Sequence, residues 1–141
     1  MGLIYLDSSV FVSLLLADSN SVRARAWLSG FAGLLLVGDF AVVETGGVIS
    51  RTERTGEITE AQADAAWLDL VAMRDQSERW RHGAGDFAES ERLVRDRSLK
   101  LSGADALHLA SAINAKASMA TFDLRLQEAA RARGVGVEAI G

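Results

Sequence analysis

The sequence predicts an α/β fold, a three-layer α/β/α sandwich with a mostly parallel central sheet. Short apolar runs alternate with longer stretches of helical pattern, and no linker, internal repeat or low-complexity tract interrupts this order. Parallel neighbours in a sheet need crossover connections, so the alternation favours a parallel sheet covered by helices. With 141 residues, 49% of them hydrophobic, the chain can fill one core, and we expect a single domain over residues 1–141.

The predicted strands are short apolar runs that end where a turn or capping residue follows. Asp7 follows the first run, Gly38 the second and Asp123 the third. A helical pattern comes after each of these three runs, which is the order expected of crossover units. The predicted strands cover residues 3–6, 34–37, 118–122 and 135–140.

The predicted helices begin at residues that can cap a helix amino terminus. Asp39 is expected to cap a helix that carries Glu44 in its early turns, and Gly46-Gly47 lowers the intrinsic stability of that helix. A final helix is expected after Asp123. Three further starts have the capping-box spacing: Thr59 with Gln62, Asp86 with Glu89, and Ser102 with Asp105.

The composition limits the chemistry and the compartment. The chain has no cysteine, which excludes disulfides and thiolate metal sites and favours a reducing, cytoplasmic location. The amino terminus lacks a basic region, and the apolar run 10–17 is far shorter than the roughly 20 residues that cross a bilayer, so we expect neither export nor a membrane span. The net charge of -4 argues against nucleic-acid binding, unless the acids hold divalent cations that reverse the local field.

Four acidic residues are expected to meet at one edge of the sheet. In an open parallel sheet, the carboxyl ends of the strands and the amino ends of the following helices share the edge where ligands bind. Asp7 and Asp123 end two predicted strands, and Glu44 and Asp105 fall in the early turns of two predicted helices. The predicted topology therefore brings all four carboxylates together.

Each of these acids also has a purely structural interpretation. Asp7 and Asp123 can cap the helices that follow them, and Asp105 can be the partner of Ser102 in a capping box. Glu44 can be a solvated residue that interacts with the helix dipole. No single acid distinguishes between the two interpretations.

Four segments in order resemble the PIN-domain family over nearly the whole chain, and in particular the VapC-like ribonuclease toxins of type II toxin–antitoxin systems. The first segment resembles the opening strand of the family, in which a metal-binding Asp is followed by a hydroxyl residue. The second segment resembles the next element of the family, in which an acid on a helix precedes a basic, glycine-containing turn. The segments are residues 3–9, Glu44 with Arg51 and residues 54–58, residues 105–110, and residues 121–126.

The resemblance implies roles for the residues in these segments. Asp7, Glu44 and Asp105 would be the principal metal-site acids, and Asp123 would complete the site directly or through water. The resemblance also implies an RNA substrate, a VapB-like antitoxin whose tail occupies the acidic groove, and a homodimer. Ser8 and Thr121 would be polar residues that support the acids. Arg51 and Arg54 are the candidates for guiding RNA, because their guanidinium groups match phosphate oxygens.

An all-acid site suits Mg²⁺ or Mn²⁺, because these hard cations prefer oxygen ligands and relieve the repulsion between carboxylates. One or two such ions would bind the scissile phosphate and lower the pKa of a coordinated water that attacks phosphorus. This hydrolysis leaves a 5′-phosphate and a 3′-hydroxyl. The expected activity is therefore that of a metal-dependent endoribonuclease.

Two other functions stay open from the sequence. A phosphatase or phosphotransferase of another α/β class would use Asp7 as a nucleophile, but Ser8-Ser9 supplies no second acid two residues on. A catalytically silent binding module would keep the fold without the activity. Cleavage of RNA, or turnover of a small phosphate ester, distinguishes these alternatives.

The two histidines are not expected to be metal ligands. His108 lies three residues after Asp105 and can share its helix face, but the hard-cation preference favours oxygen and half-buried histidines are common. His82 lies among arginines and is expected in a solvated loop.

Overall fold

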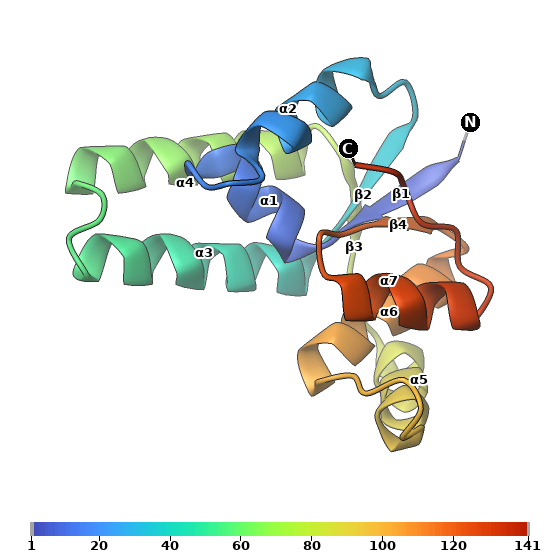
Figure 1. Ribbon diagram of the computed structural model, residues 1–141. Coiled ribbons are helices and arrows are strands. Elements are labelled where there is room, and N and C mark those ends of the chain that lie inside the picture. Colours follow the sequence, from blue (N-terminus) through green and yellow to red (C-terminus); the bar gives the residue numbers. More distant parts are fainter. Residues whose placement is uncertain (1, 141) are drawn as a thin grey trace.

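The computed structural model of the protein describes residues 2–140, so Met1 and Gly141, the ends of the predicted domain, lie outside the described residues. Figure 1 shows a sheet in the middle of the molecule with helices on both of its faces. No helix in the described range is long and apolar enough to cross a membrane. In chain order the elements are β1 (Leu3–Leu6), α1 (Ser8–Leu15), α2 (Ser21–Gly30), β2 (Leu34–Gly38), α3 (Asp39–Arg54), α4 (Glu60–Asp75), β3 (Glu78–Trp80), α5 (Ala84–Arg95), α6 (Gly103–Ala115), β4 (Ser118–Ala120) and α7 (Leu124–Ala132).

The sheet has the strand order β3-β2-β1-β4, and the pairings between these strands are parallel. In the register, Tyr5 lies beside Leu36 on one side and Met119 on the other. Helices α1 and α2 connect β1 to β2, and α3 and α4 connect β2 to β3, as parallel pairing requires. The predicted fold class, an α/β sandwich with a parallel central sheet, is confirmed.

Side chains of the central strands alternate between the two faces of the sheet and build a core on each. Tyr5 and Met119 belong to the core shared with α5, α6 and α7. Leu6 and Ala120 belong to the core shared with α1, α2, α3 and α4. Because both faces are covered, the central strands β1 and β2 are apolar runs without polar alternation, and this pattern identified them in the sequence.

Helices α3 and α4 lie side by side and extend beyond the sheet (Figure 1). The two glycines in α3 differ in their surroundings. A Cβ atom at Gly46 would lie 2.4 Å from Cη2 of Trp67, whereas one at Gly47 would have nothing within 4 Å. Gly46 therefore lets the Trp67 ring of α4 pack against the backbone of α3, and this contact offsets part of its low helix propensity.

The helix caps expected at Thr59 and Ser102 are confirmed. Thr59 and Gln62 form the reciprocal bonds of a capping box, at 3.1 and 2.8 Å. The Ser102 hydroxyl accepts the N–H of Asp105 at 3.2 Å.

Two other expected caps are wrong. Asp39 is the first residue of α3 and forms an ion pair with Arg79 at 2.7 Å. Asp86 does not start α5, which begins at Ala84; its carboxylate accepts the N–H of Gly83 from within the first turn.

The strand predictions need three corrections. Residues 135–140 form no strand, and Val137 makes only an isolated parallel bridge with Met119. Strand β4 ends at Ala120, two residues earlier than expected. Strand β3 was not predicted, because it has only three residues and two of them are charged. Helix α2 was not predicted either, because it has no continuous apolar stripe.

The sheet reverses its connection order between β1 and β4. The chain first moves from β1 outward through β2 to β3, and it then returns through α5 and α6 to β4 on the other side of β1. At the carboxyl end of this pair, the N–H of Asp7 donates to the carbonyl of Ala120 at 3.0 Å. In open α/β sheets, such a switch point is where ligands bind.

Candidate active site

Asp7 lies directly after β1, is 4% exposed, and is held by hydroxyl groups on one side. Its Oδ2 accepts bonds from the Thr121 hydroxyl at 2.8 Å, the Ser9 hydroxyl at 2.7 Å and the Ser9 N–H at 3.4 Å. Its Oδ1 lies 3.6 Å from Nε2 of His108. One carboxylate oxygen is thus fixed by the protein, and the other faces the neighbouring site residues.

Glu44 approaches the same place from the second turn of α3. Nε2 of the buried His108 is hydrogen-bonded to Oε1 of Glu44. Burial alone would raise the pKa of Glu44, but the hydrogen bond and charge of His108, together with a hydrogen bond from the Ser8 hydroxyl, lower the pKa below its usual value. Among the expected polar supports, Thr121 donates to Asp7, and Ser8 contributes to the lowered pKa of Glu44.

Asp105 and Asp123 add two more carboxylates. Asp105 is in the first turn of α6, and burial raises its pKa, as do the negative charges of Asp123 and Asp7. Asp123 precedes α7, where its Oδ1 accepts the N–H groups of Arg125 and Leu126 at 2.9 and 3.3 Å.

The capping interpretation holds for Asp7 and Asp123, but it uses only one oxygen of each. Asp7 caps α1 through Oδ2, and Asp123 caps α7 through Oδ1. The N-cap position also orients each carboxylate at the edge of the sheet, because its bonded oxygen must face the helix amino terminus. Capping and ligand binding are therefore compatible at these positions.

The donor chemistry fits a hard divalent cation, although the side chains do not form a closed ligand cage. Within residues 2–140, no three side chains of the His, Cys, Asp or Glu type are placed closely enough to hold a metal ion as they stand. The negative charges of Asp123 and Asp7 nevertheless add to the effect of burial in raising the pKa of Asp105. A hard cation such as Mg²⁺ relieves the repulsion between carboxylates, and waters can complete its coordination.

Sequence reasoning missed two contributors to this arrangement. His108 is 1% exposed and contacts both Glu44 and Asp7, a position indicated only by its spacing of three residues from Asp105. Ser9, rather than Ser8, donates to Asp7. His82 was also misplaced, because its side chain is only 8% exposed rather than solvated.

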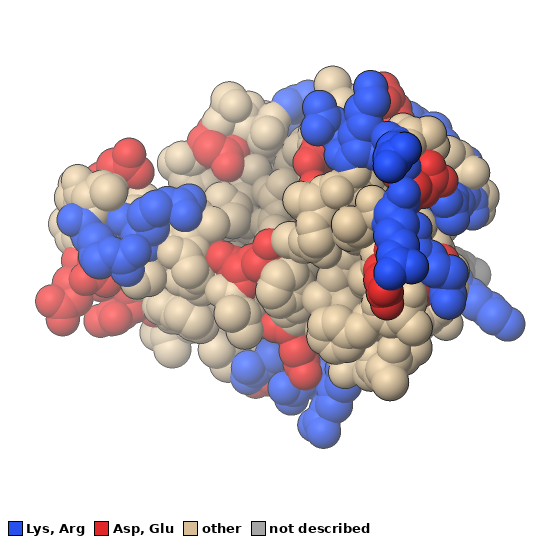
Figure 2. Space-filling model, turned by 90° about the horizontal axis from the view of Figure 1, so that it is seen from below, with Lys and Arg blue, Asp and Glu red and all other residues tan. Residues whose placement is uncertain are grey.

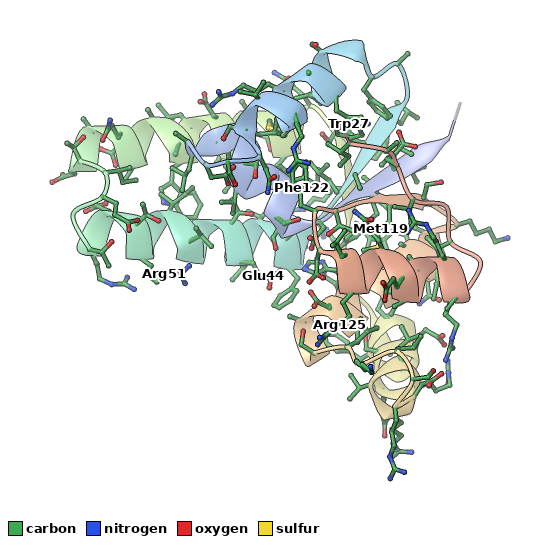
Figure 3. All side chains as sticks on the ribbon, in the orientation of Figure 1. Trp27, Glu44, Arg51, Met119, Phe122 and Arg125 are labelled. Carbon is green, nitrogen blue, oxygen red and sulfur yellow. The ribbon has the colours of Figure 1, made fainter. Side chains whose placement is uncertain are left out.

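Basic side chains lie further along α3 from the acids. Figure 2 shows acidic side chains near the centre of the face seen from below, with basic side chains toward both sides. In Figure 3, Arg51 extends from α3 on the same side as Glu44. Arg51 and Arg54 are both exposed, and Arg54 donates to the Ser50 hydroxyl at 2.7 Å.

The fold and this acidic edge define an α/β protein with a carboxylate site at the switch point of a parallel sheet. The model of the PIN domain family matches residues 4–132. The chain belongs to the PIN domain family. Its relatives include ribonuclease VapC45 of Mycobacterium tuberculosis (strain CDC 1551 / Oshkosh), which is 32% identical over 143 residues, covering 97% of this chain and 95% of that protein. Ribonuclease VapC49 of Mycobacterium tuberculosis (strain ATCC 25618 / H37Rv) matches equally well, with 32% identity and the same coverage.

Solved structures share the fold at lower sequence identity. VapC20 of Mycobacterium tuberculosis, described as a Sarcin-Ricin loop cleaving toxin, has a TM-score of 0.73 and 18% identity, covering 89% of this chain and 94% of that one. FitAcB from Neisseria gonorrhoeae has a TM-score of 0.68 and 19% identity, covering 96% of both chains. At sequence identities this low, the similarity to these structures shows a shared fold and nothing further.

Proposed function

We propose that this chain is a divalent-cation-dependent endoribonuclease and the toxin of a toxin–antitoxin pair. The observation that carries the proposal is the placement of Asp7 directly after β1 and Asp123 directly before α7 at the switch point, with Glu44 bonded to His108 beside Asp7. Membership of the PIN domain family and the ribonuclease names of both relatives at 32% identity support the reaction type.

The cation is Mg²⁺ or Mn²⁺, held by Asp7, Glu44 and Asp105, with Asp123 completing the site directly or through water. When bound, the cation supplies Lewis-acid stabilisation of the scissile phosphate and makes water a nucleophile near neutral pH. The role of the chain itself is to present oxygen ligands in fixed orientations. Oδ2 of Asp7 is held by neighbouring hydroxyl groups, so its Oδ1 is the oxygen available to the cation.

The substrate is RNA, and its phosphates meet Arg51 and Arg54. Arg51 forms no salt bridge within the part of the chain that the structure describes, so its guanidinium group is available to phosphate oxygens. Its position seven residues after Glu44 places it two turns further along α3, on the side where Glu44 lies (Figure 3). RNA that follows α3 would therefore extend from the arginines to the acids.

The partner is a VapB-like antitoxin, and the toxin forms a homodimer in the cytoplasm. Neighbours in fold include the VapBC2 complex from Rickettsia felis bound to a DNA fragment from their promoter, with a TM-score of 0.68 and 14% identity, and a VapBC-1 structure from nontypeable Haemophilus influenzae, with a TM-score of 0.66 and 10% identity. An antitoxin tail that carries a basic residue would suit an edge of repelling carboxylates, because its charge relieves the repulsion as a cation does.

The test compares the wild type with Asp7→Asn, using Asp69→Asn as a matched control on the exposed side of α4. Each protein is incubated with RNA in Mg²⁺, in Mn²⁺ or in chelator, and product ends are analysed. We expect cleavage by the wild type and Asp69→Asn with either cation, 5′-phosphate ends, and a loss of at least about 100-fold in Asp7→Asn. Cyclic phosphate ends, cleavage in chelator, or an active Asp7→Asn protein would overturn the proposal.

A further inference from the structure

His108 lies between two of the acids without being one of the expected ligands. Its Nε2 is hydrogen-bonded to Oε1 of Glu44 and lies 3.6 Å from Oδ1 of Asp7. Its Nδ1 lies 2.7 Å from the Tyr5 hydroxyl. We propose that His108 is a positioning residue that holds Glu44 of α3 beside Asp7 of β1, with Tyr5 as its fixed support, and this inference rests on the proposed metal site.

The direction of the hydrogen bond to Glu44 follows from the partners. Ionised carboxylates have no proton to donate, so Nε2 of His108 carries the proton that points at Glu44 and Asp7. The Tyr5 hydroxyl can donate to Nδ1 of a neutral ring or accept from Nδ1 of a charged one. Tyr5 therefore supports the same ring orientation whichever of the two forms is present.

Glu44 needs such a support more than the other acids do. Asp7 is fixed by three donors on one oxygen, whereas Glu44 has a longer side chain on another element. Without a cation, its negative charge is repelled by Asp7, and holding it in one rotamer costs conformational entropy. His108 opposes both effects because its directed N–H bonds Glu44 and lies between Glu44 and Asp7.

The support behind His108 is itself rigid. Tyr5 is 0% exposed in the core of the sheet, and the ring of Phe40 packs on His108 with centroids 5.4 Å apart. A Cβ atom at Gly38 would lie 2.7 Å from the Tyr5 hydroxyl, so the glycine leaves room for it. A fixed ring on α6, one turn after Asp105, thus links the elements that carry three of the acids.

His82 provides a matched control for His108. It is also nearly buried and also packs against Phe40, with centroids 6.3 Å apart. Its Nε2 accepts the N–H of Phe40 at 3.1 Å, and its Nδ1 lies 2.9 Å from the Ser111 hydroxyl, so it contacts neither Glu44 nor Asp7. A purely structural contribution from a buried histidine would appear in variants at both positions.

The experiment measures Mn²⁺ affinity by isothermal titration calorimetry for the wild type, His108→Leu, His108→Gln, Tyr5→Phe and His82→Gln. We expect His108→Leu to weaken binding by about tenfold or more, the range seen when residues that orient metal ligands are removed. The Gln side chain places an amide N–H the same number of bonds from Cα as His Nε2, so His108→Gln should recover much of the affinity. His82→Gln should bind as the wild type does.

Cleavage kinetics add a readout that separates positioning from RNA binding. In His108→Leu at saturating Mn²⁺, we expect kcat to fall by about tenfold or more while KM for RNA changes by less than about threefold, because His108 is buried behind the acids rather than exposed to RNA. His108→Gln should recover kcat in part.

The outcomes separate this inference from the proposed function. If the wild type does not bind Mn²⁺, the metal site fails and the positioning role fails with it. If the wild type binds and His108→Leu binds equally well, or if His82→Gln and His108→Leu lose affinity alike, the positioning role alone is overturned. If His108→Leu does not fold, Tyr5→Phe decides, since a loss of about threefold or more is expected and wild-type affinity would overturn the inference.

Discussion

Two groups of polar side chains, one around His82 and Asp86 and one around His108 and the acidic edge, each contain a histidine and carboxylates, and they differ in how the carboxylate oxygens are satisfied. Asp86 is 3% exposed and accepts from Nε1 of Trp80 at 2.8 Å, from the Asn114 amide at 2.7 Å and from the Gly83 N–H at 3.3 Å. Neutral donors thus serve both of its oxygens. At the acidic edge, burial and the negative charges of Asp123 and Asp7 instead raise the pKa of Asp105.

This difference distinguishes a structural acid from a candidate ligand. A buried carboxylate with donors on both oxygens is stabilised by the fold itself. Carboxylates that face other carboxylates are stabilised by a cation, which the protein must obtain from solution. Asp86 belongs to the first kind, and Asp105, whose pKa burial and the charges of Asp123 and Asp7 raise, is a candidate for the second.

The histidines differ in the same way. Burial lowers the pKa of His82, and the charges of Asp86 and Asp39 do not fully offset it. Burial also acts to lower the pKa of His108, but the hydrogen bond to Glu44 and the charges of Asp7, Glu44 and Asp105 outweigh it and raise the pKa. The more deeply buried histidine is thus the one whose pKa is raised, because it has a hydrogen bond to Glu44 and three negative neighbours.

The largest effect on stability is expected at Asp86. Asp86→Ala leaves Nε1 of Trp80 and the amide of Asn114 without their acceptor, and we expect it to lower the free energy of unfolding by about 3 kcal/mol in urea at neutral pH. Cleavage activity per folded molecule should stay at the wild-type level. Asp69→Ala on the exposed side of α4 is the control and should change stability by less than about 0.5 kcal/mol. A selective loss of activity in Asp86→Ala would contradict the contrast between the two groups.

A smaller but more specific effect is expected at Thr121. Its hydroxyl donates to Oδ2 of Asp7 at 2.8 Å and accepts the N–H of Asp123 at 3.0 Å. Thr121→Val keeps the shape but releases Asp7, so we expect activity to fall about 10-fold to 100-fold. Thr121→Ser keeps the hydroxyl and should retain most of the activity. Equal rates for the two variants in a Mn²⁺-dependent cleavage assay would show that the orientation of Asp7 does not depend on this bond.

A gain of stability, rather than a loss, is expected at Asp105 when no metal is present. Because the pKa of Asp105 is raised in the fold, its ionised form destabilises the folded state, and this penalty appears as pH rises through the folded-state pKa. In chelator at neutral pH, Asp105→Asn should therefore unfold at higher urea than the wild type, by less than the Asp86→Ala effect. The difference should vanish below pH 3.8, where the ordinary carboxyl is protonated in both states. With Mn²⁺ added, the wild type should gain more stability than the variant, and an equal gain would argue against Asp105 as a ligand.

The fold and the position of the acids were accessible from the sequence, because both depend on local pattern. Buried parallel strands are apolar runs, and the residues that end them lie at the edge where ligands bind. This reasoning located β1, β2 and β4 and placed Asp7 and Asp123 at the switch point. Edge strand β3 was missed because pairing with β2 alone, rather than an apolar run, makes it a strand.

The contacts inside the site were not accessible in the same way. The spacing of His108 from Asp105 indicates a shared face of α6, but which neighbours that face meets depends on how α6 packs on β1 and α3. Ser8 and Ser9 are adjacent, and only the first turn of α1 determines that Ser9 bonds Asp7. Asp86 had the spacing of a helix start, but its donors come from Trp80 and Asn114, which lie in other elements.

The smallest expected effect is the pH dependence at His82, which tests whether this histidine is held neutral. The groups that face it are Asp86, Asp39 and His108, and with burial as the largest cause its pKa is lowered from 6.5. As pH falls through 6.5, the unfolded chain takes up a proton that the folded protein does not, so the folded state loses stability. His82→Gln lacks this loss, and its unfolding free energy should therefore decline less than that of the wild type between pH 7.5 and 5.5, measured in chelator with urea. A steeper decline in the variant would mean that His82 is charged in the fold, and the two histidines would then differ in contacts but not in charge.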